Sequence, residues 1–249
     1  MKSFDNQKFF WGIFIVSLLS ISLIGYYSPI HQSLAYHHFS EQRTIWGIPH
    51  FGDVITNLCF SIAGILVWFK NKNNLEHYNG QKFIFNGFCL SAIALCFGSG
   101  YYHWNPNNFG LFWDRITMLL GFTFIFIDTC IRYHIFNHRY IVTKTFILQF
   151  VFLCSLIPWV TCERLEIYVL AQFFVMSIMP LLAIKDWLEH GEKNKHILLM
   201  FLFYTFAKIF ESTDDSYLQL IYISGHSIKH ICYAVALYYF GNGILKKAS

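Results

Sequence analysis

Charged side chains are scarce in this sequence. Of its 249 residues, 13% are charged and 55% are hydrophobic, whereas soluble domains average about 25% charged residues. A soluble core of this size does not need such a composition. The formal net charge is only +4 and the chain contains no run of basic residues, so the electrostatic pattern of a nucleic-acid-binding protein is missing. The composition therefore favours a membrane protein and gives no support to a nucleic-acid partner.

Paired cysteines are also missing. The seven cysteines are scattered, mostly within apolar stretches, and no two of them form a CxxC pair. An odd and unpaired set of this kind predicts neither a disulfide framework nor a thiolate metal site. We interpret these cysteines as small apolar side chains of the protein interior.

Long apolar runs are abundant. Most approach the roughly 20 residues that a helix needs to cross a hydrocarbon layer about 30 Å thick, and they are too long for the roughly 10-residue strands of a membrane barrel. The runs cover residues 9–27, 51–69, 83–102, 111–131, 143–160, 165–184, 197–210 and about 226–245. The first is longer than the apolar part of a signal peptide, so we expect it to be retained. The pattern predicts an all-α, polytopic membrane helix bundle with eight spans.

The positions of lysine and arginine predict the orientation of this bundle. Cytoplasmic loops of membrane proteins carry an excess of both residues. The segments before the first run, after every second run and at the C-terminal end are rich in them, whereas the alternate segments carry only Arg43, Arg115 and Arg164. Eight crossings with both termini in the cytoplasm satisfy this distribution.

Five polar residues from distant parts of the chain converge under this topology. Ionisable residues within membrane helices are costly and therefore mark candidate functional sites. All five lie near the extracytoplasmic ends of the third, fourth and eighth expected helices: Ser99, His103, Asp114, His226 and His230. The expected topology rests on the apolar runs and on the positions of lysine and arginine, so this convergence is independent support for a site at this face.

The spacing of these residues fits a metal site. His226 and His230 are four residues apart and share one face of a helix. Together with His103 and a water they would form the open tetrahedral arrangement of a catalytic zinc site, in which the pKa of the water falls to about 7. Asp114 can accept a proton from that water or orient a histidine, and Ser99 can hydrogen-bond the water or a developing oxyanion.

Each feature also has a simpler interpretation. An HxxxH pair alone is weak evidence for a metal, His103 alone can be an interfacial histidine, and Asp114 can pair with Arg115 to cap a helix start. It is the joint occurrence of these residues at one face that favours the metal site. Asp53, Thr56 and Asn57, at the start of the second span, are candidates for lining the bundle interior and supporting that site.

Several other polar residues have structural interpretations. Lys208 and Glu211 lie three residues apart near the outer end of the seventh span and can pair within the bundle. Asp214 is expected in solvent or as a cap of the next segment. Asp128, near the inner end of the fourth span, has no assigned role.

The same stretches resemble the alkaline ceramidases. The resemblance rests on Gly98-Ser99-Gly100-Tyr101-Tyr102-His103, Trp113-Asp114-Arg115, Gly225-His226-Ser227-Ile228-Lys229-His230, Thr44–Asp53 and Thr56-Asn57-Leu58. The sequence is most similar to the bacterial ceramidase-like members of this family. The family lies in a superfamily of seven-helix membrane hydrolases that includes the adiponectin receptors. The resemblance extends over about residues 41–245.

The resemblance implies a zinc-dependent lipid amidohydrolase. It implies Zn²⁺ ligands at His103, His226 and His230 and catalytic roles for Asp114 and Ser99. The substrate would be a ceramide-like N-acyl lipid that enters from the bilayer and is cleaved to a sphingoid or other amine and a fatty acid.

The resemblance also implies a domain organisation. A seven-helix domain over residues 41–249 would follow an extra N-terminal transmembrane helix and outer loop over residues 1–40. The expected location is a bacterial inner membrane, with the active site toward the extracytoplasmic face. His50 stands where the family's calcium-binding glutamate is expected, so we do not expect a calcium site, and the substrate can be another N-acyl lipid.

Three alternatives remain open at this stage. A receptor-like or lipid-binding membrane protein with a structural zinc would hold a lipid without turning it over. A haem-binding electron carrier would use the paired histidines and absorb visible light. A channel or transporter is less favoured, because the polar residues cluster at one face and do not form a path across the membrane.

Overall fold

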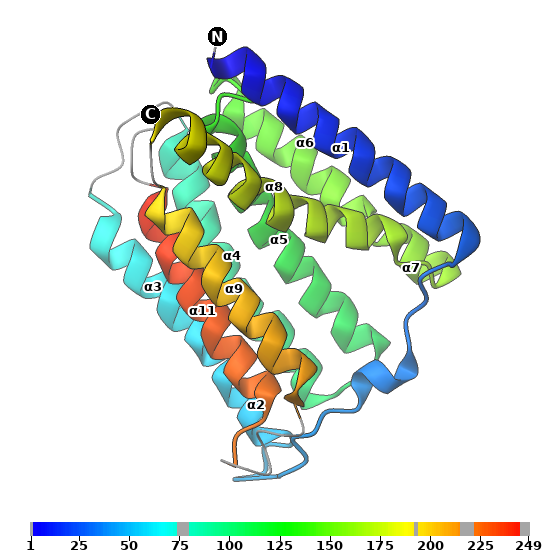
Figure 1. Ribbon diagram of the computed structural model, residues 1–249. Coiled ribbons are helices and arrows are strands. Elements are labelled where there is room, and N and C mark those ends of the chain that lie inside the picture. Colours follow the sequence, from blue (N-terminus) through cyan, green and yellow to red (C-terminus); the bar gives the residue numbers. More distant parts are fainter. Residues whose placement is uncertain (1, 74–79, 192–193, 215–221, 245–249) are drawn as a thin grey trace.

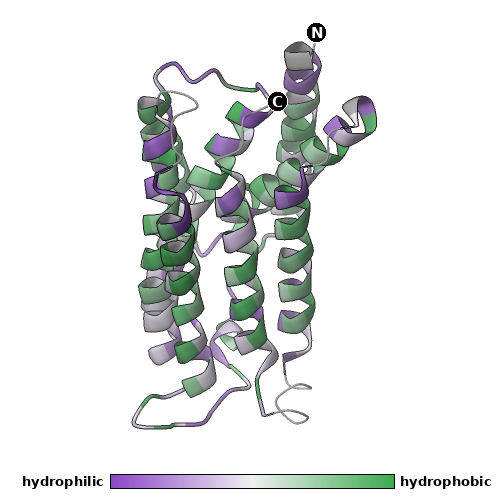
Figure 2. Cartoon of the chain, turned by 90° about the vertical axis from the view of Figure 1, so that its left-hand side faces the viewer, coloured by the Kyte–Doolittle hydropathy of each residue, from purple (hydrophilic) through white to green (hydrophobic). Residues whose placement is uncertain are grey.

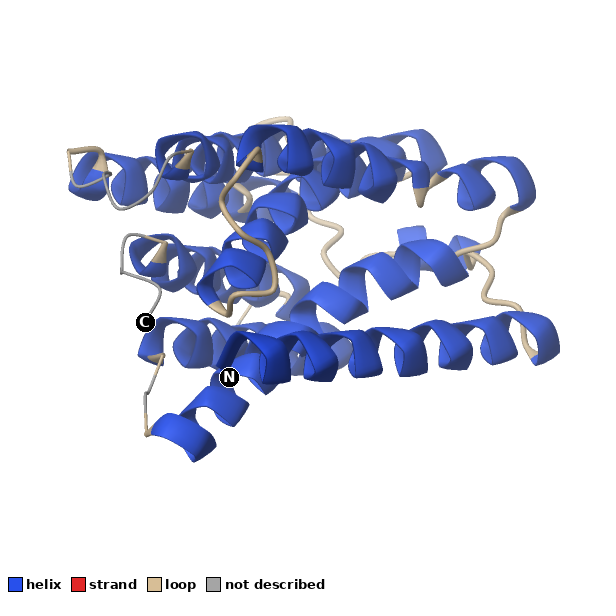
Figure 3. Ribbon diagram, turned by 90° about the horizontal axis from the view of Figure 1, so that it is seen from above, coloured by secondary structure: helices blue, strands red, loops and turns tan. Residues whose placement is uncertain are grey.

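The chain folds into helices joined by short loops, as a computed structural model shows for residues 2–73, 80–191, 194–214 and 222–244 (Figure 1). The elements are α1 Lys2–Tyr27, η1 Leu34–His37, α2 Phe51–Thr56, α3 Leu58–Asn71, α4 Gln81–Trp104, α5 Asn108–Arg132, α6 Ile141–Cys154, α7 Ile157–Cys162, α8 Glu166–His190, α9 Lys195–Ser212 and α11 Gly225–Gly243. The prediction of an all-α bundle is confirmed for the described residues (Figure 3). Residue 245, the end of the last expected span, lies outside them.

Six helical stretches of the described chain are long and apolar enough to cross a membrane. They cover residues 5–27, 51–71, 81–104, 108–132, 141–162 and 166–189, so that α2 and α3 form one stretch and α6 and α7 another. The protein is therefore a multi-pass membrane protein. The two remaining expected spans correspond to α9 and α11, which have 18 and 19 residues. Both carry polar and charged side chains, so helix length and composition alone do not divide the bundle into seven helices plus one.

The helices pack in neighbouring pairs. The helix α4 lies against α5, α9 lies against α11, and α3 contacts both α4 and α11. The first helix, α1, lies at the edge of the bundle, where it packs against α8 (Figure 1). Hydrophobic residues dominate the helices, and hydrophilic residues gather toward the helix ends and loops (Figure 2). Many large apolar side chains of α1, such as Val16, Leu19 and Leu23, face outward, as expected for a helix in contact with lipid.

A local break between α2 and α3 shapes one wall of the candidate functional site. The side-chain amide of Asn57 donates to the carbonyl oxygen of Asp53 at 2.6 Å, in competition with the regular backbone ladder. The helix is interrupted at Asn57 and resumes at Leu58. Thr56, the last residue of α2, thereby comes within hydrogen-bonding distance of α11.

The close approach of α4 and α5 depends on Gly98. A Cβ atom at this position would lie 2.4 Å from the Oγ1 atom of Thr117 and 2.9 Å from the carbonyl oxygen of Trp113. Both contacts are too short for a real side chain. Glycine at position 98 therefore lets α4 approach α5 at Trp113. Ser99 follows Gly98 and Asp114 follows Trp113, so this approach keeps Ser99 and Asp114 near each other.

Candidate metal centre

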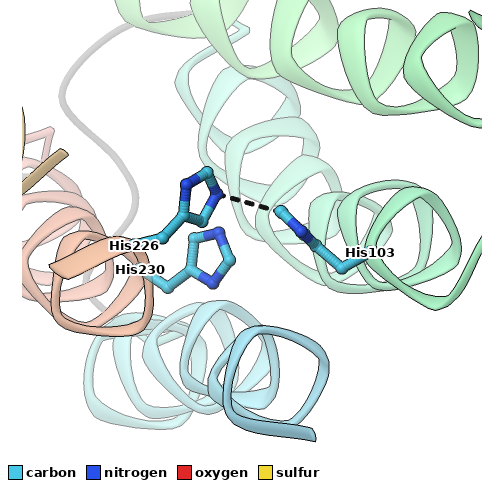
Figure 4. Close-up of side chains that lie close together, drawn as sticks. All are labelled: His103, His226 and His230. Carbon is cyan, nitrogen blue, oxygen red and sulfur yellow. Dashed lines mark hydrogen bonds between the residues drawn. The ribbon is translucent and has the colours of Figure 1, made fainter. Parts of the chain in front are cut away.

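Three buried histidines lie together between two helices. His103 comes from the last turn of α4, and His226 and His230 come from the first turns of α11 (Figure 4). Their exposed fractions are 2%, 9% and 2%, in that order. The Nε2 atoms of His103 and His226 are 3.2 Å apart, and one nitrogen from each of the three rings lies within 4.8 Å of the other two. The predicted convergence of α4 and α11 on one site is confirmed.

This geometry fits a metal ion. Zinc–nitrogen bonds of 2.0–2.1 Å in a tetrahedral site place two ligand nitrogens about 3.4 Å apart. The separation between His103 and His226 is already close to that value, and a nitrogen of His230 lies within 4.8 Å of both. Three imidazoles suit zinc, copper, iron or nickel, so the donor set indicates a metal without selecting which one.

Thr56 fixes the tautomer of His230. The Thr56 hydroxyl donates its one hydrogen to the carbonyl oxygen of Gly52 at 2.8 Å, and it also lies 3.0 Å from the Nδ1 atom of His230. Since its hydrogen is already used, the hydroxyl accepts from an Nδ1–H group of His230. The Nε2 lone pair of His230 is then free to bind a metal, which is the usual way in which metal-binding histidines are oriented. The supporting role suggested for Thr56 agrees with this contact.

We expect Thr56→Val to weaken metal binding by about 10- to 100-fold, the usual cost of removing a partner that orients a ligand. Valine keeps the shape of threonine but removes the hydroxyl that lies 3.0 Å from the Nδ1 atom of His230. Competition with a chromophoric zinc chelator measures the affinity. Thr161→Val is the matched control, because the Thr161 hydroxyl is exposed and donates within its own helix, to the carbonyl oxygen of Ile157. An unchanged affinity in Thr56→Val would contradict this role.

The start of α11 is stabilised by side chains that accept hydrogen bonds from its backbone N–H groups and its serine hydroxyls. Ser224 caps the helix by accepting from the backbone N–H of Ser227 at 2.9 Å. One oxygen of the buried Asp53 carboxylate accepts from both serine hydroxyls, at 2.6 and 2.7 Å. Asp214 accepts from the backbone N–H of His226 at 2.7 Å. Asp214 therefore caps the next helix, one of its two expected roles, and Asp53 holds the helix that carries two of the histidines.

A charged network reaches the site from α9. The Glu211 carboxylate pairs with Lys208 at 2.8 Å, which confirms the predicted pairing, and also with Lys229 at 3.0 Å. The Lys229 Nζ atom lies 2.6 Å from the Nε2 atom of His226. Lys229 therefore donates toward the lone pair that a metal would use, and the Glu211 carboxylate binds the same ammonium group. The sequence alone does not indicate this link, although Lys229 stands within the HxxKH pattern.

Ser99 and Asp114 lie beside the histidines. Both are buried, and the Ser99 hydroxyl interacts with the Asp114 carboxylate. The alternative in which Asp114 and Arg115 cap a helix start is wrong, since α5 begins earlier, at Asn108, with Asn107 as its cap. In the described part of the chain Arg115 forms no ion pair with Asp114.

One amphipathic cavity of about 370 Å³ joins all five predicted site residues. Its polar part is lined by Ser99, His103, Asp114, Arg115, His226, Lys229 and His230. Its apolar part is lined by Phe122, Ile125, Met176, Met200 and Leu237, among others. Along α5, Phe122 and Ile125 lie two to three turns beyond Asp114, or about 12–16 Å at 1.5 Å per residue. The cavity thus runs from the histidines into the apolar interior of the bundle.

The loop after α1 covers the histidines. The Phe39 ring lies with its centroid 4.5 Å from that of His103 and 5.1 Å from that of His226. The Nδ1 atom of His37 lies 3.0 Å from the Tyr102 hydroxyl, and this contact ties the loop to α4. Loop residues carry no periodic sequence signal, so Phe39 was not a candidate.

Glu41, also in this loop, is engaged by Arg43. Both carboxylate oxygens accept hydrogen bonds from the guanidinium group of Arg43. Burial works to raise the pKa of Glu41, but the hydrogen bonds and charge of Arg43 outweigh it and hold the pKa below its ordinary value. His50 donates from its Nδ1 atom to the Glu41 backbone oxygen at 2.6 Å, because a carbonyl oxygen can only accept.

Comparisons with known proteins add no family. No protein-family model matches the chain, and searches of the curated proteins and of the solved structures find no match either. The sequence and the structure together show a polytopic helical membrane protein with a buried group of His103, His226 and His230 that can hold a metal ion.

Proposed function

We propose that this protein is a zinc-dependent intramembrane hydrolase of the alkaline ceramidase type, which cleaves the amide bond of ceramide-like N-acyl lipids. The observation that carries the proposal is one cavity that holds three histidines able to bind a metal, a carboxylate and a hydroxyl, and that continues into an apolar chamber. A zinc-type hydrolase needs this set of groups, and a lipid chain needs the apolar extension.

The metal would be held by His103, His226 and His230. A zinc ion in such a site lowers the pKa of a bound water to about 7 and polarises a carbonyl group. In the proposed reaction, Asp114 accepts a proton from the attacking water and returns it to the nitrogen of the leaving amine. Ser99 donates a hydrogen bond to the carbonyl oxygen as negative charge develops on it. The amide C–N bond breaks, the water oxygen joins the carbonyl carbon, and a fatty acid and an amine are released.

The proposal includes the arrangement in the membrane. Residues 41–249 would form a seven-helix hydrolase domain, with α1 and its outer loop, residues 1–40, as an addition. The peripheral position of α1 supports this division. Both termini would face the cytoplasm of a bacterial inner membrane and the site would face the other side. The distribution of lysine and arginine supports this orientation, and the lysine-poor loop that covers the histidines lies at the same end of the bundle as the site.

A receptor-like or lipid-binding protein with a structural zinc is the second candidate. The same amphipathic cavity favours it, because such a cavity can hold a permanent lipid as well as a substrate. The two candidates differ in whether a lipid is converted.

Multiple turnover separates the two. We expect detergent-purified protein to release fatty acid from ceramide or another N-acyl lipid for many cycles per molecule. Treatment with 1,10-phenanthroline should abolish this release, and added zinc should restore it, because the site loses and regains the ion that activates water. Mass spectrometry of the released acid and amine is the measurement. Lipid that co-purifies and is never cleaved would contradict the hydrolase and support the binding protein.

A further inference from the structure

Arg115 is a buried cation whose hydrogen-bonding groups are only partly used. It lies on α5, directly after Asp114, and is 5% exposed. One terminal nitrogen, Nη2, donates to the Gln32 side chain. The other, Nη1, is buried and has no hydrogen-bond partner among the described residues. Buried donors are rarely left in this state, and a charged one least of all.

Two aromatic rings hold the guanidinium group in place. Its central carbon lies 4.1 Å from the ring centroid of Trp159 and 4.7 Å from that of Tyr168. Such cation–π contacts satisfy the faces of the guanidinium plane. Its N–H groups lie in that plane and point outward, so they stay available to an acceptor in the plane. The side chain is therefore fixed in position and still able to bind an anion.

The charges around the cavity favour an anionic ligand. The ionised side chains that line it are the cations Arg115, Lys208 and Lys229 and the carboxylates Asp114 and Glu211, which leaves one positive charge in excess. Glu211 pairs with both lysines, and Asp114 interacts with Ser99. Arg115 is thus the lining cation without a carboxylate partner in the described part of the chain, and a metal ion would add further positive charge.

We propose that Arg115 binds a carboxylate carried by the lipid, so that this cavity prefers acidic N-acyl lipids, such as N-acyl amino acids, to neutral ceramides. A guanidinium edge matches a carboxylate in shape and charge. Because Arg115 follows Asp114 on the same helix and lines the same cavity as the histidines, a lipid with its amide at the histidines can place an acidic head group at Arg115. The inference rests on the proposed function for the position of the amide; the binding of an anion at Arg115 does not require turnover.

The test compares two lipids that differ in charge. Calorimetric titration of detergent-purified protein at neutral pH should show N-palmitoylglycine binding roughly tenfold more tightly than N-palmitoylethanolamine, as expected for a charge-assisted hydrogen bond. Arg115→Gln should remove this preference and leave binding of the neutral lipid nearly unchanged. Arg139→Gln is the matched control, since Arg139 is exposed and its guanidinium contacts Tyr140, and it should keep the preference. Equal binding of the two lipids by the wild-type protein would overturn the proposal without any variant.

Further variants separate this proposal from the proposed function. His226→Ala/His230→Ala removes the metal ligands, and it should retain the preference for N-palmitoylglycine although it cannot turn the lipid over. A preference that is lost in that variant and kept in Arg115→Gln would show that the metal, and not Arg115, receives the anion.

If Arg115→Gln does not fold, Arg115→Lys serves: it keeps the charge but loses the planar fork, so its preference should be weaker than that of the wild type. Palmitate is the third ligand. If palmitate binding depends on Arg115 while the two amides bind equally, Arg115 receives the carboxylate of the fatty-acid product, and the proposal is overturned.

Discussion

His103→Ala should bring the hydrolysis of N-acyl lipids down to background, a loss of about a thousandfold or more, which corresponds to roughly 4 kcal/mol of transition-state stabilisation. His103 is the one ligand from α4, and its Nε2 atom lies 3.2 Å from that of His226. Without it, the pair on α11 cannot complete a three-nitrogen site. Fatty-acid release under multiple-turnover conditions is the measurement.

The control for this experiment is His138→Ala, which removes an exposed histidine beyond the other end of α5. Both variants should elute as single species in size-exclusion chromatography and unfold at temperatures close to that of the wild type. Full turnover by a folded His103→Ala protein would rule out the metal mechanism.

Asp114→Asn should lower kcat by about 10²- to 10⁴-fold, the usual contribution of a positioned acid–base group, while the metal content stays unchanged. Asparagine keeps the shape of the side chain and its contact with Ser99, but it cannot take up and return a proton. Steady-state kinetics and metal analysis of the same preparation give both numbers. Asp5→Asn, at an exposed position on α1, should have no effect.

The metal content of Asp114→Asn distinguishes between two roles of Asp114. A fall in activity with full metal content supports proton transfer by Asp114. Metal and activity lost in parallel would instead mean that Asp114 positions the histidines, and unchanged activity would exclude it from the reaction.

Much of the fold and the centre of the site could be predicted from the sequence because both follow from local patterns. Apolar runs gave the helices to within a few residues at most ends, and the four-residue spacing of His226 and His230 placed both imidazoles on one face. The alternation of lysine-rich and lysine-poor segments then put these residues at the same end of the bundle as His103. That grouping is present in the structure.

The parts that could not be predicted depend on contacts between distant segments. Lys229 reaches Glu211 only because α9 packs on α11. Phe39 covers the histidines from an irregular loop, and Arg115 lies between Trp159 and Tyr168, which belong to other helices. Asp128, which had no role, forms a buried pair with Arg132 one helical turn away at 2.9 Å. The four-residue spacing of Asp128 and Arg132 can be read from the sequence, but it does not show that both side chains are buried.

The most direct test of the metal site is elemental analysis of detergent-purified protein, with the wild type beside His226→Ala/His230→Ala. We predict one zinc ion per wild-type chain and none in the double variant, because the variant keeps only His103 of the three ligands. Wild-type protein that was prepared without chelators and contains no metal would contradict the metal site and with it the proposed hydrolase.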